Sequence, residues 1–194
     1  MDFYFSINEK EEAENTIERS RFIAYLIPAQ DKPEATAALE KVKSIHPKAT
    51  HHCWAYKVGA PEKPEEYYSD DGEPSGTAGA PILQSIKKAN LENVMLIIVR
   101  YFGGIKLGVR GLIDAYAETA TLVLEKAKKI KMRQTVSLPF SISYSGYDTL
   151  RYKIEKLEGT IQNPTFKENI EAYAIVPKVN EKAAREIIEN LQRS

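Results

Sequence analysis

Apolar positions in the first two thirds of the chain change between the period of strands and that of helices. Residues 20–28 and 50–58 alternate or carry apolar side chains on both faces, which predicts strands. Residues 94–99 are almost continuously apolar, as in a strand covered on both sides. Pro33 and Pro81 suit the first turns of helices. The predicted elements are a hairpin over 13–28, helices over 33–46, 81–89 and 108–130, and strands over 50–58 and 94–99.

The last third of the chain repeats the alternation of strand and helix on a smaller scale. Pro139 predicts an edge position or a bulge in the first of its strands. The order β-α-β-β-α is that of a ferredoxin-like module without its last strand. We therefore expect two domains, residues 1–133 and 134–194. The predicted elements of the second domain are strands over 136–144, 160–166 and 169–177, and helices over 147–157 and from Asn180 onward.

Residues 59–78 show no apolar period, which predicts a long loop. Structureless segments of this length are uncommon inside compact domains and often carry function. The sequence interpretation therefore places a functional loop between the second predicted strand and the second predicted helix.

Composition restricts the function less than the pattern does. The 27 Lys and Arg residues balance 27 Asp and Glu residues among 194, so no global field draws the protein to nucleic acid or membrane. Cys53 is the only cysteine, which excludes an intrachain disulfide. The N-terminus has no signal-peptide pattern, and no apolar run approaches the length of a membrane span. We expect a soluble, cytoplasmic protein that binds any charged partner locally.

A glycine-rich segment, residues 99–112, connects the apolar strand to the long helix; we call it the arch. Its glycines allow tight turns or the close approach of another molecule. Arg100, Lys106 and Arg110 flank this backbone, and the helix N-terminus behind it favours anions. Tyr101 and Phe102 suit stacking on bases. The arch therefore predicts a docking surface for phosphate, although glycines that merely allow close packing and aromatic residues in the core would give the same pattern.

The segment 70–79, the acidic loop, gathers three carboxylates and two hydroxyls within ten residues. Oxygen ligands of this kind suit Mg²⁺, but the spacing is not that of an EF-hand. The alternatives are an ordered turn whose side chains cap backbone N–H groups, and an ion-paired unit formed with the arch. The residues concerned are Asp70, Asp71, Glu73, Ser75 and Thr77.

Histidines next to the cysteine raise the question of a zinc site. Neighbouring strand residues point to opposite faces, so at most one of His51 and His52 shares a face with Cys53. No further pair lies at zinc-finger spacing, and we expect Cys53 to be a buried, small apolar residue. One histidine can contact the acidic loop. The sequence also has no G-x-S-x-G elbow and no Walker A loop.

These motifs resemble those of the YigZ/IMPACT family. The segments that carry the resemblance are residues 20–23 (SRFI), 49–56 (ATHHCWAY), 70–79 (DDGEPSGTAG) and 100–108 (RYFGGIKLG). The resemblance covers essentially the whole chain. It implies an α+β fold, with a first domain like ribonuclease PH and domain IV of elongation factor G, and a ferredoxin-like second domain similar to domain V of that factor.

The resemblance also implies a function. In eukaryotic relatives the IMPACT domain belongs to regulators of translation under amino-acid stress, which bind a ribosome-associated scaffold protein. This chain departs from bacterial relatives at Val109, Arg110 and Asp114, where they usually have a small residue, Gly and a basic residue. Arg110 and Asp114 are one helical turn apart and can pair. The positive charge is then moved toward the arch.

Our hypothesis from the sequence is a non-catalytic binding protein linked to translation, without a cofactor, that recognises RNA or a ribosome-associated partner. One alternative is an enzyme on a phosphorylated small molecule, with Mg²⁺ held by the acidic loop. Another is a module that binds only proteins. The predicted binding residues are Ser20, Arg21, His51, Asp70, Asp71, Glu73, Ser75, Thr77, Arg100, Tyr101, Phe102, Gly103, Gly104, Lys106, Gly108 and Arg110.

Overall fold

The computed structural model describes residues 3–192, which divide into two compact units. The first unit runs from Tyr4 to Met132, and the second comprises Phe3 and the residues from Arg133 onward. Within the described part of the chain, each helix is too short or too polar to cross a membrane.

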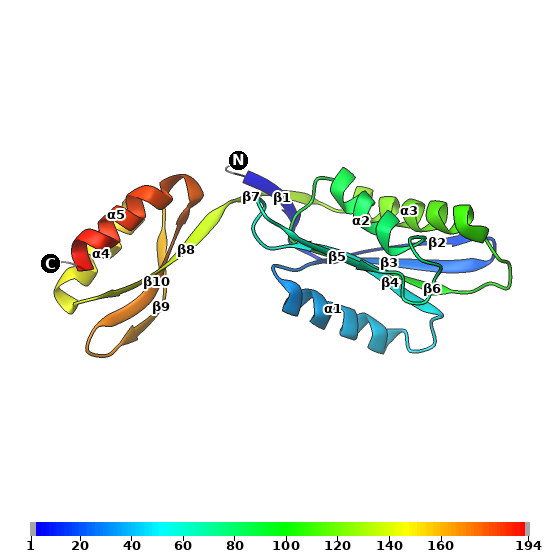
Figure 1. The fold of residues 1–194 in the computed structure, drawn as a ribbon, viewed down its shortest axis with the longest axis horizontal. Helices are drawn as coiled ribbons and strands as arrows, with labels where there is room; N and C mark the ends of the chain where they lie inside the picture. The colour runs from blue at the N-terminus through cyan, green and yellow to red at the C-terminus, as the bar shows by residue number, and fades with distance from the viewer. Residues whose placement is uncertain (1–2, 193–194) are drawn as a thin grey trace. The chain divides into compact units, whose positions relative to one another are not determined.

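The first unit is built on an antiparallel sheet of five strands in the order β2-β3-β6-β4-β5 (Figure 1). The central strand β6 is buried at every position but its last, which confirms the predicted strand covered on both sides. The strands are β2 (Glu11–Ile17), β3 (Ser20–Pro28), β4 (His51–Val58), β5 (Glu65–Ser69) and β6 (Val94–Tyr101).

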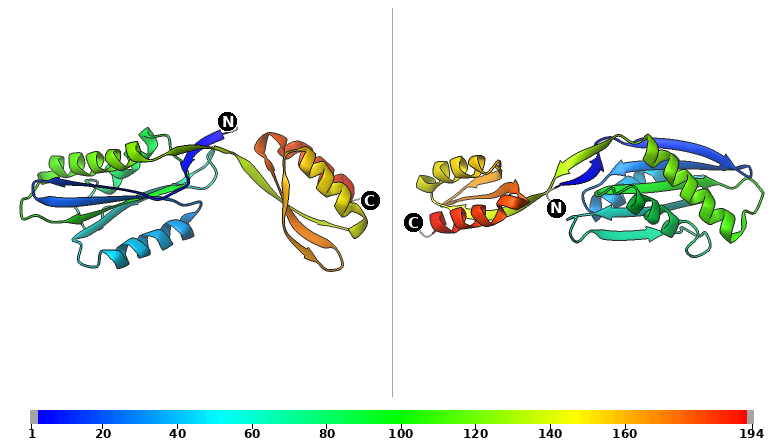
Figure 2. Two further views of the ribbon diagram at one scale, coloured as in Figure 1. Left: turned by 180° about the vertical axis from the view of Figure 1, so that it is seen from behind. Right: turned by 90° about the horizontal axis from the view of Figure 1, so that it is seen from above.

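Helices cover both faces of this sheet. Helices α2 (Gly79–Lys88) and α3 (Gly108–Lys126) lie on one face, and α1 (Lys32–Ile45) lies on the other (Figures 1 and 2). Two hydrophobic clusters result, one on each face of β6. The end of β6 and the start of α3 therefore meet at one corner of the unit, where the arch connects them.

Two predictions for this unit were wrong, and a two-stranded sheet was missed. The stretch 59–78 is not all loop, because β5 pairs with β4 as an edge strand. The helix predicted to residue 130 ends at Lys126, because Ala127 takes an extended conformation (φ −69°, ψ 131°). Residues Lys129–Arg133 then form β7, which pairs with β1 (Phe3–Ile7) in a separate two-stranded sheet. The side chains of β7 alternate in exposure with the period of two typical of strands.

The second unit is an antiparallel sheet of three strands in the order β8-β10-β9, with both helices on one face (Figure 2). Its elements follow the predicted order β-α-β-β-α. Pro139 lies in β8, an edge strand, as predicted. The likeness to ferredoxin-like and ribonuclease PH-like domains stays a prediction; the fold shown is a mixed α/β one. The elements are β8 (Thr135–Ile142), α4 (Tyr144–Lys156), β9 (Thr160–Phe166), β10 (Ile170–Pro177), the 3₁₀ turn η1 (Lys178–Asn180) and α5 (Glu181–Gln192).

Candidate functional site

Arg100, near the end of β6, is buried and not a surface cation. Its side chain is 5% exposed, and Nη1 donates to Oε1 of Glu73 over 2.6 Å. Its Nη2 donates to the Ser20 hydroxyl over 3.3 Å, and its guanidinium lies 5.4 Å from the ring centre of Phe22. The prediction that Arg100 offers an available charge at the arch is therefore corrected. The pair confirms the alternative in which the acidic loop forms an ion-paired unit with the arch.

Glu73 is the acceptor that joins three elements. Its Oε1 also accepts from the Tyr116 hydroxyl on α3 over 2.9 Å and lies 3.9 Å from Nε2 of His51 on β4. Cys53 extends the cluster, with Sγ 3.2 Å from the Tyr116 oxygen. Burial raises the pKa of the Cys53 thiol and that of the Tyr116 hydroxyl, so both stay neutral. Cys53 is fully buried, as predicted.

Asp70 caps the N-terminus of α2. Its Oδ1 accepts from the backbone N–H groups of Ala78 and Gly79 over 2.9 and 2.8 Å, and its Oδ2 accepts from that of Gly76 over 2.9 Å. A carboxylate at this place satisfies helix donors that have no partner within the helix. This confirms the alternative in which the acidic loop is an ordered, capped turn.

Asp71 ties the acidic loop to β4. Its Oδ2 accepts from the backbone N–H of His52 over 2.6 Å, and its carbonyl oxygen lies 2.8 Å from Nδ1 of His51. The prediction that a histidine contacts the acidic loop is confirmed. The described residues contain no group of three or more His, Cys, Asp or Glu side chains that could hold a metal ion.

Four of the predicted residues, Thr77, Ser75, Arg21 and Tyr101, do not contribute to the exposed part of the arch. Thr77 is buried and donates to the Pro74 carbonyl, while Ser75 is exposed. Arg21 makes a two-point ion pair with Glu14 across the hairpin. Tyr101, one position after Arg100, faces the α1 side of the sheet, where its hydroxyl lies 2.9 Å from Nδ1 of His46.

The arch itself depends on two glycines in different ways. A Cβ at Gly103 would lie 2.0 Å from the carbonyl carbon of Arg19, so this position allows two segments of backbone to pack closely. The Gly103 N–H donates to the Ser20 hydroxyl over 3.2 Å. Gly104 faces open space but has φ +88°, a conformation that favours glycine. Gly108, with φ +69°, begins α3.

The exposed part of the arch combines apolar and cationic side chains. Phe102 is 47% exposed and Val109 is 62% exposed. Lys106, which lies between them in the sequence, is exposed, and Arg110 pairs with Asp114 over 3.0 Å, as its spacing predicted. The first turn of α3 has neither a side-chain cap nor an acidic residue, so its amides leave a positive potential here. We call Phe102, Lys106, Val109 and Arg110 the arch surface.

A cavity of about 290 Å³ opens beside the arch surface. Most of its wall is carbon, and Lys106 stands at its edge. Its lining residues are Glu73, Pro74, Arg100, Phe102, Lys106, Leu107, Gly108, Val109 and Leu112.

Sequence reasoning missed Arg19 and the hydroxyl of Tyr116. Arg19 is an exposed cation whose backbone packs against Gly103, and its place next to Ser20 was the available signal. Tyr116 lies on the apolar stripe of α3, which hides the role of its hydroxyl. Its partner comes from a loop 43 residues away, a separation no periodic pattern records.

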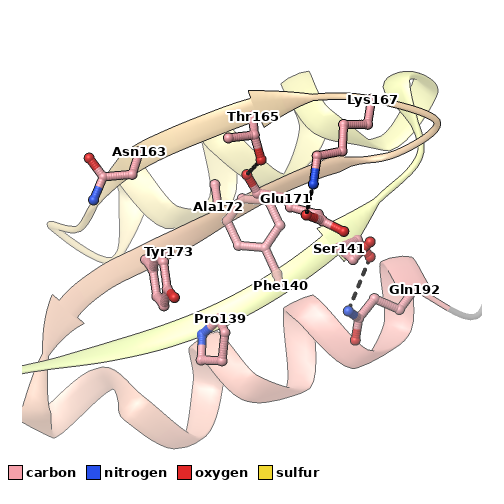
Figure 3. Close-up of a pocket in the computed structure, with 10 residues that line it drawn as sticks. All are labelled: Pro139, Phe140, Ser141, Asn163, Thr165, Lys167, Glu171, Ala172, Tyr173 and Gln192. Carbon is pink, nitrogen blue, oxygen red and sulfur yellow. Dashed lines mark hydrogen bonds and ion pairs between the residues drawn. The ribbon is translucent and has the colours of Figure 1, made fainter.

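The second unit has a hollow of about 640 Å³ on its sheet (Figure 3). Tyr173 is 46% exposed and lies opposite Pro139 in the register of β10 and β8. Among the described residues, the charged side chains in its lining are Lys167 and Glu171, which pair with each other over 3.3 Å. The described lining of this hollow therefore offers hydrogen-bonding groups, an aromatic ring face and one ion pair.

Known proteins match most of the chain, including the acidic loop and the arch. The family described as the Impact N-terminal domain matches residues 18–124. IMPACT family member YvyE of Bacillus subtilis is 35% identical over 87% of this chain and 77% of its own length. IMPACT family member YigZ of Escherichia coli is 32% identical over 78% of this chain and 74% of its own length.

Solved structures match as well. One titled "Crystal structure of an hypothetical protein" is 27% identical, covers 100% of this chain and 94% of that chain, and has a TM-score of 0.80. The two-domain translational regulator Yih1 matches 63% of this chain at 22% identity, with a TM-score of 0.37, which is too low to support an argument.

Proposed function

The chain belongs to the IMPACT family, and from this premise we propose that it is a non-catalytic binding protein linked to translation. It recognises RNA or a ribosome-associated partner through the arch surface. The link to translation extends to this chain what the resemblance implies for the eukaryotic relatives.

The observation that supports this proposal is the composition of the arch surface. Two large apolar side chains, Phe102 and Val109, are exposed beside Lys106 and the uncapped start of α3. Exposed apolar residues next to a local charge are typical of interaction sites. The net charge of the chain is zero, so the attraction for an anionic partner comes from this corner.

The acidic loop gives little support to the alternative of a metal-dependent enzyme. Asp70, Asp71 and Glu73 each accept hydrogen bonds from backbone or side-chain groups of the protein itself. A metal ion would have to displace these donors. Their arrangement favours a structural role, in which the acidic loop holds the ends of β6 and α3 together through Glu73.

Co-sedimentation with purified ribosomes at low salt tests the proposed function. We expect the wild-type protein to pellet with ribosomes and Lys106→Glu to stay in the supernatant. Lys41→Glu, an exposed lysine on α1 across the sheet, is the control for the same change of charge. Equal pelleting of both variants, or no pelleting of the wild type, contradicts the proposal.

A further inference from the structure

The cavity beside the arch surface has a mostly apolar lining, which determines the kind of group that it can bind. We propose that it accepts a single large apolar side chain of a partner protein, on a segment that carries carboxylates on either side of that residue. This inference rests on the proposed function and identifies the partner's chemistry at the same site.

The apolar wall argues for a side chain and against a nucleobase. Pro74, Leu107 and Leu112 contribute carbon surface, and Phe102 and Val109 form an exposed edge. A base carries donors and acceptors around its rim, and burying them without partners is unfavourable. A leucine or phenylalanine side chain has no hydrogen-bonding groups to lose on burial. Apolar side chains that fill pockets contribute much of the binding energy of protein interfaces.

Two of the three charged residues in the lining, Arg100 and Glu73, are already paired with each other. Arg100 and Glu73 form a buried ion pair 2.6 Å apart, so their charges largely cancel at the cavity. The Nε of Arg100 has no hydrogen-bond partner but is fully buried, which places it out of reach of a ligand that enters the cavity. Recognition inside the cavity is therefore by shape and apolar contact.

Charge complementarity determines what flanks the apolar anchor. Lys106 lies at the edge of the cavity, and α3 begins there with uncapped amides and no acidic residue in its first turn. Carboxylates next to the anchor meet positive potential at this edge, whereas basic residues would be repelled.

Nuclear magnetic resonance titration of the ¹⁵N-labelled full chain with short blocked peptides tests this inference. The first probe is acetyl-Asp-Asp-Leu-Asp-Asp-amide. The matched probes replace its leucine by alanine, or its four aspartates by lysines, and the nucleic-acid probe is single-stranded pentauridylate. We expect the first probe to shift the amides of residues 102–112, and both matched probes to bind at least about tenfold more weakly.

A variant shows whether the cavity is the binding place. Val109→Asp puts a carboxylate at the edge of the cavity, in a helix turn where acidic residues are favourable, so folding is preserved. We expect it to lose the leucine peptide. Val179→Asp, at a valine 54% exposed in η1, is the matched control and retains it.

Three outcomes overturn the inference. In the first, pentauridylate shifts the amides of residues 102–112 and the leucine peptide does not. In the second, the peptide binds Val109→Asp as well as it binds the wild type. In the third, shifts at the cavity depend on protein concentration alone, which indicates binding of a second copy of the chain. Ribosome co-sedimentation separates this failure from that of the proposed function. If pelleting depends on Lys106 but is unchanged in Val109→Asp, the arch surface binds ribosomes and the cavity takes no part.

Discussion

Glu73 connects the acidic loop to both elements that the arch joins. One of its oxygens accepts from Arg100 on β6 and from Tyr116 on α3. A buried ion pair contributes little net stability against an apolar replacement, but removing one partner leaves the other charge without compensation. The carboxylate is therefore required because the guanidinium is present.

Replacing Glu73 by alanine tests this dependence. We expect Glu73→Ala to lower the free energy of unfolding by about 3–5 kcal/mol, because Arg100 is left charged and buried. Asp114→Ala removes the partner of Arg110 in an exposed pair and should cost under about 1 kcal/mol. Urea unfolding of both variants measures the difference. A Glu73→Ala protein as stable as Asp114→Ala would show that Arg100 finds another partner or water.

His46 gives the first unit a dependence on pH. Its Nε2 lies 2.6 Å from the Tyr25 hydroxyl and its Nδ1 lies 2.9 Å from the Tyr101 hydroxyl. Burial, with a smaller effect from His52, lowers the pKa of His46 below its ordinary value of 6.5. The unfolded chain therefore binds a proton at a higher pH than the folded chain does.

The sign of the effect follows from that difference. Stability is complete above pH about 6.5, falls as the pH drops below the unfolded pKa, and levels off below the lowered folded pKa. We expect the difference in unfolding free energy between wild type and His46→Gln to shrink on going from pH 7.5 to 5.5 in urea titrations. A difference that stays constant or grows over this range contradicts a lowered pKa.

At the scale of elements, period and burial were the features that the sequence predicted best. Val94–Val99 had to be a central strand because few other places can bury six consecutive apolar residues. Strands β5 and β7 were missed because their sequences, EEYYS and KIKMR, are mostly polar. Such edge strands are held by backbone pairing with neighbours, which a hydrophobic pattern does not reveal.

The glycines of the sequence located the arch, but they did not reveal the role of each glycine. Gly103→Ala should destabilise the first unit by more than about 2 kcal/mol, because its Cβ would overlap the Arg19 backbone. Gly104→Ala should cost about 1 kcal/mol, since the space is open and only the positive φ is unfavourable. Thermal or urea unfolding ranks the two variants. The reverse order would mean that the β2–β3 turn moves to accommodate the methyl group introduced at position 103 at a lower cost than that of the positive φ at position 104.

At the scale of the whole molecule, the sequence predicted which segments form the candidate site but not which of their charged side chains are buried. The sequence located the acidic loop and the arch, and the structure brings them together. It did not separate buried from exposed cations, because Arg100, Lys106 and Arg110 are equivalent in a pattern of letters. Arg100 differs because its partner, Glu73, is distant in the sequence, whereas Arg110 pairs with the nearby Asp114, as its spacing predicted.

This separation predicts how salt affects binding by a chain without net charge. The arch surface holds two exposed cations, Lys106 and Arg110, the second of which also pairs with Asp114. Two contacts with RNA phosphates weaken ribosome binding by about tenfold between 50 and 200 mM salt, whereas six to ten contacts would weaken it about 10³-fold or more. Co-sedimentation across this range measures the slope. A steep loss would require cations beyond the arch surface, and Lys106→Glu would then remove only part of the binding.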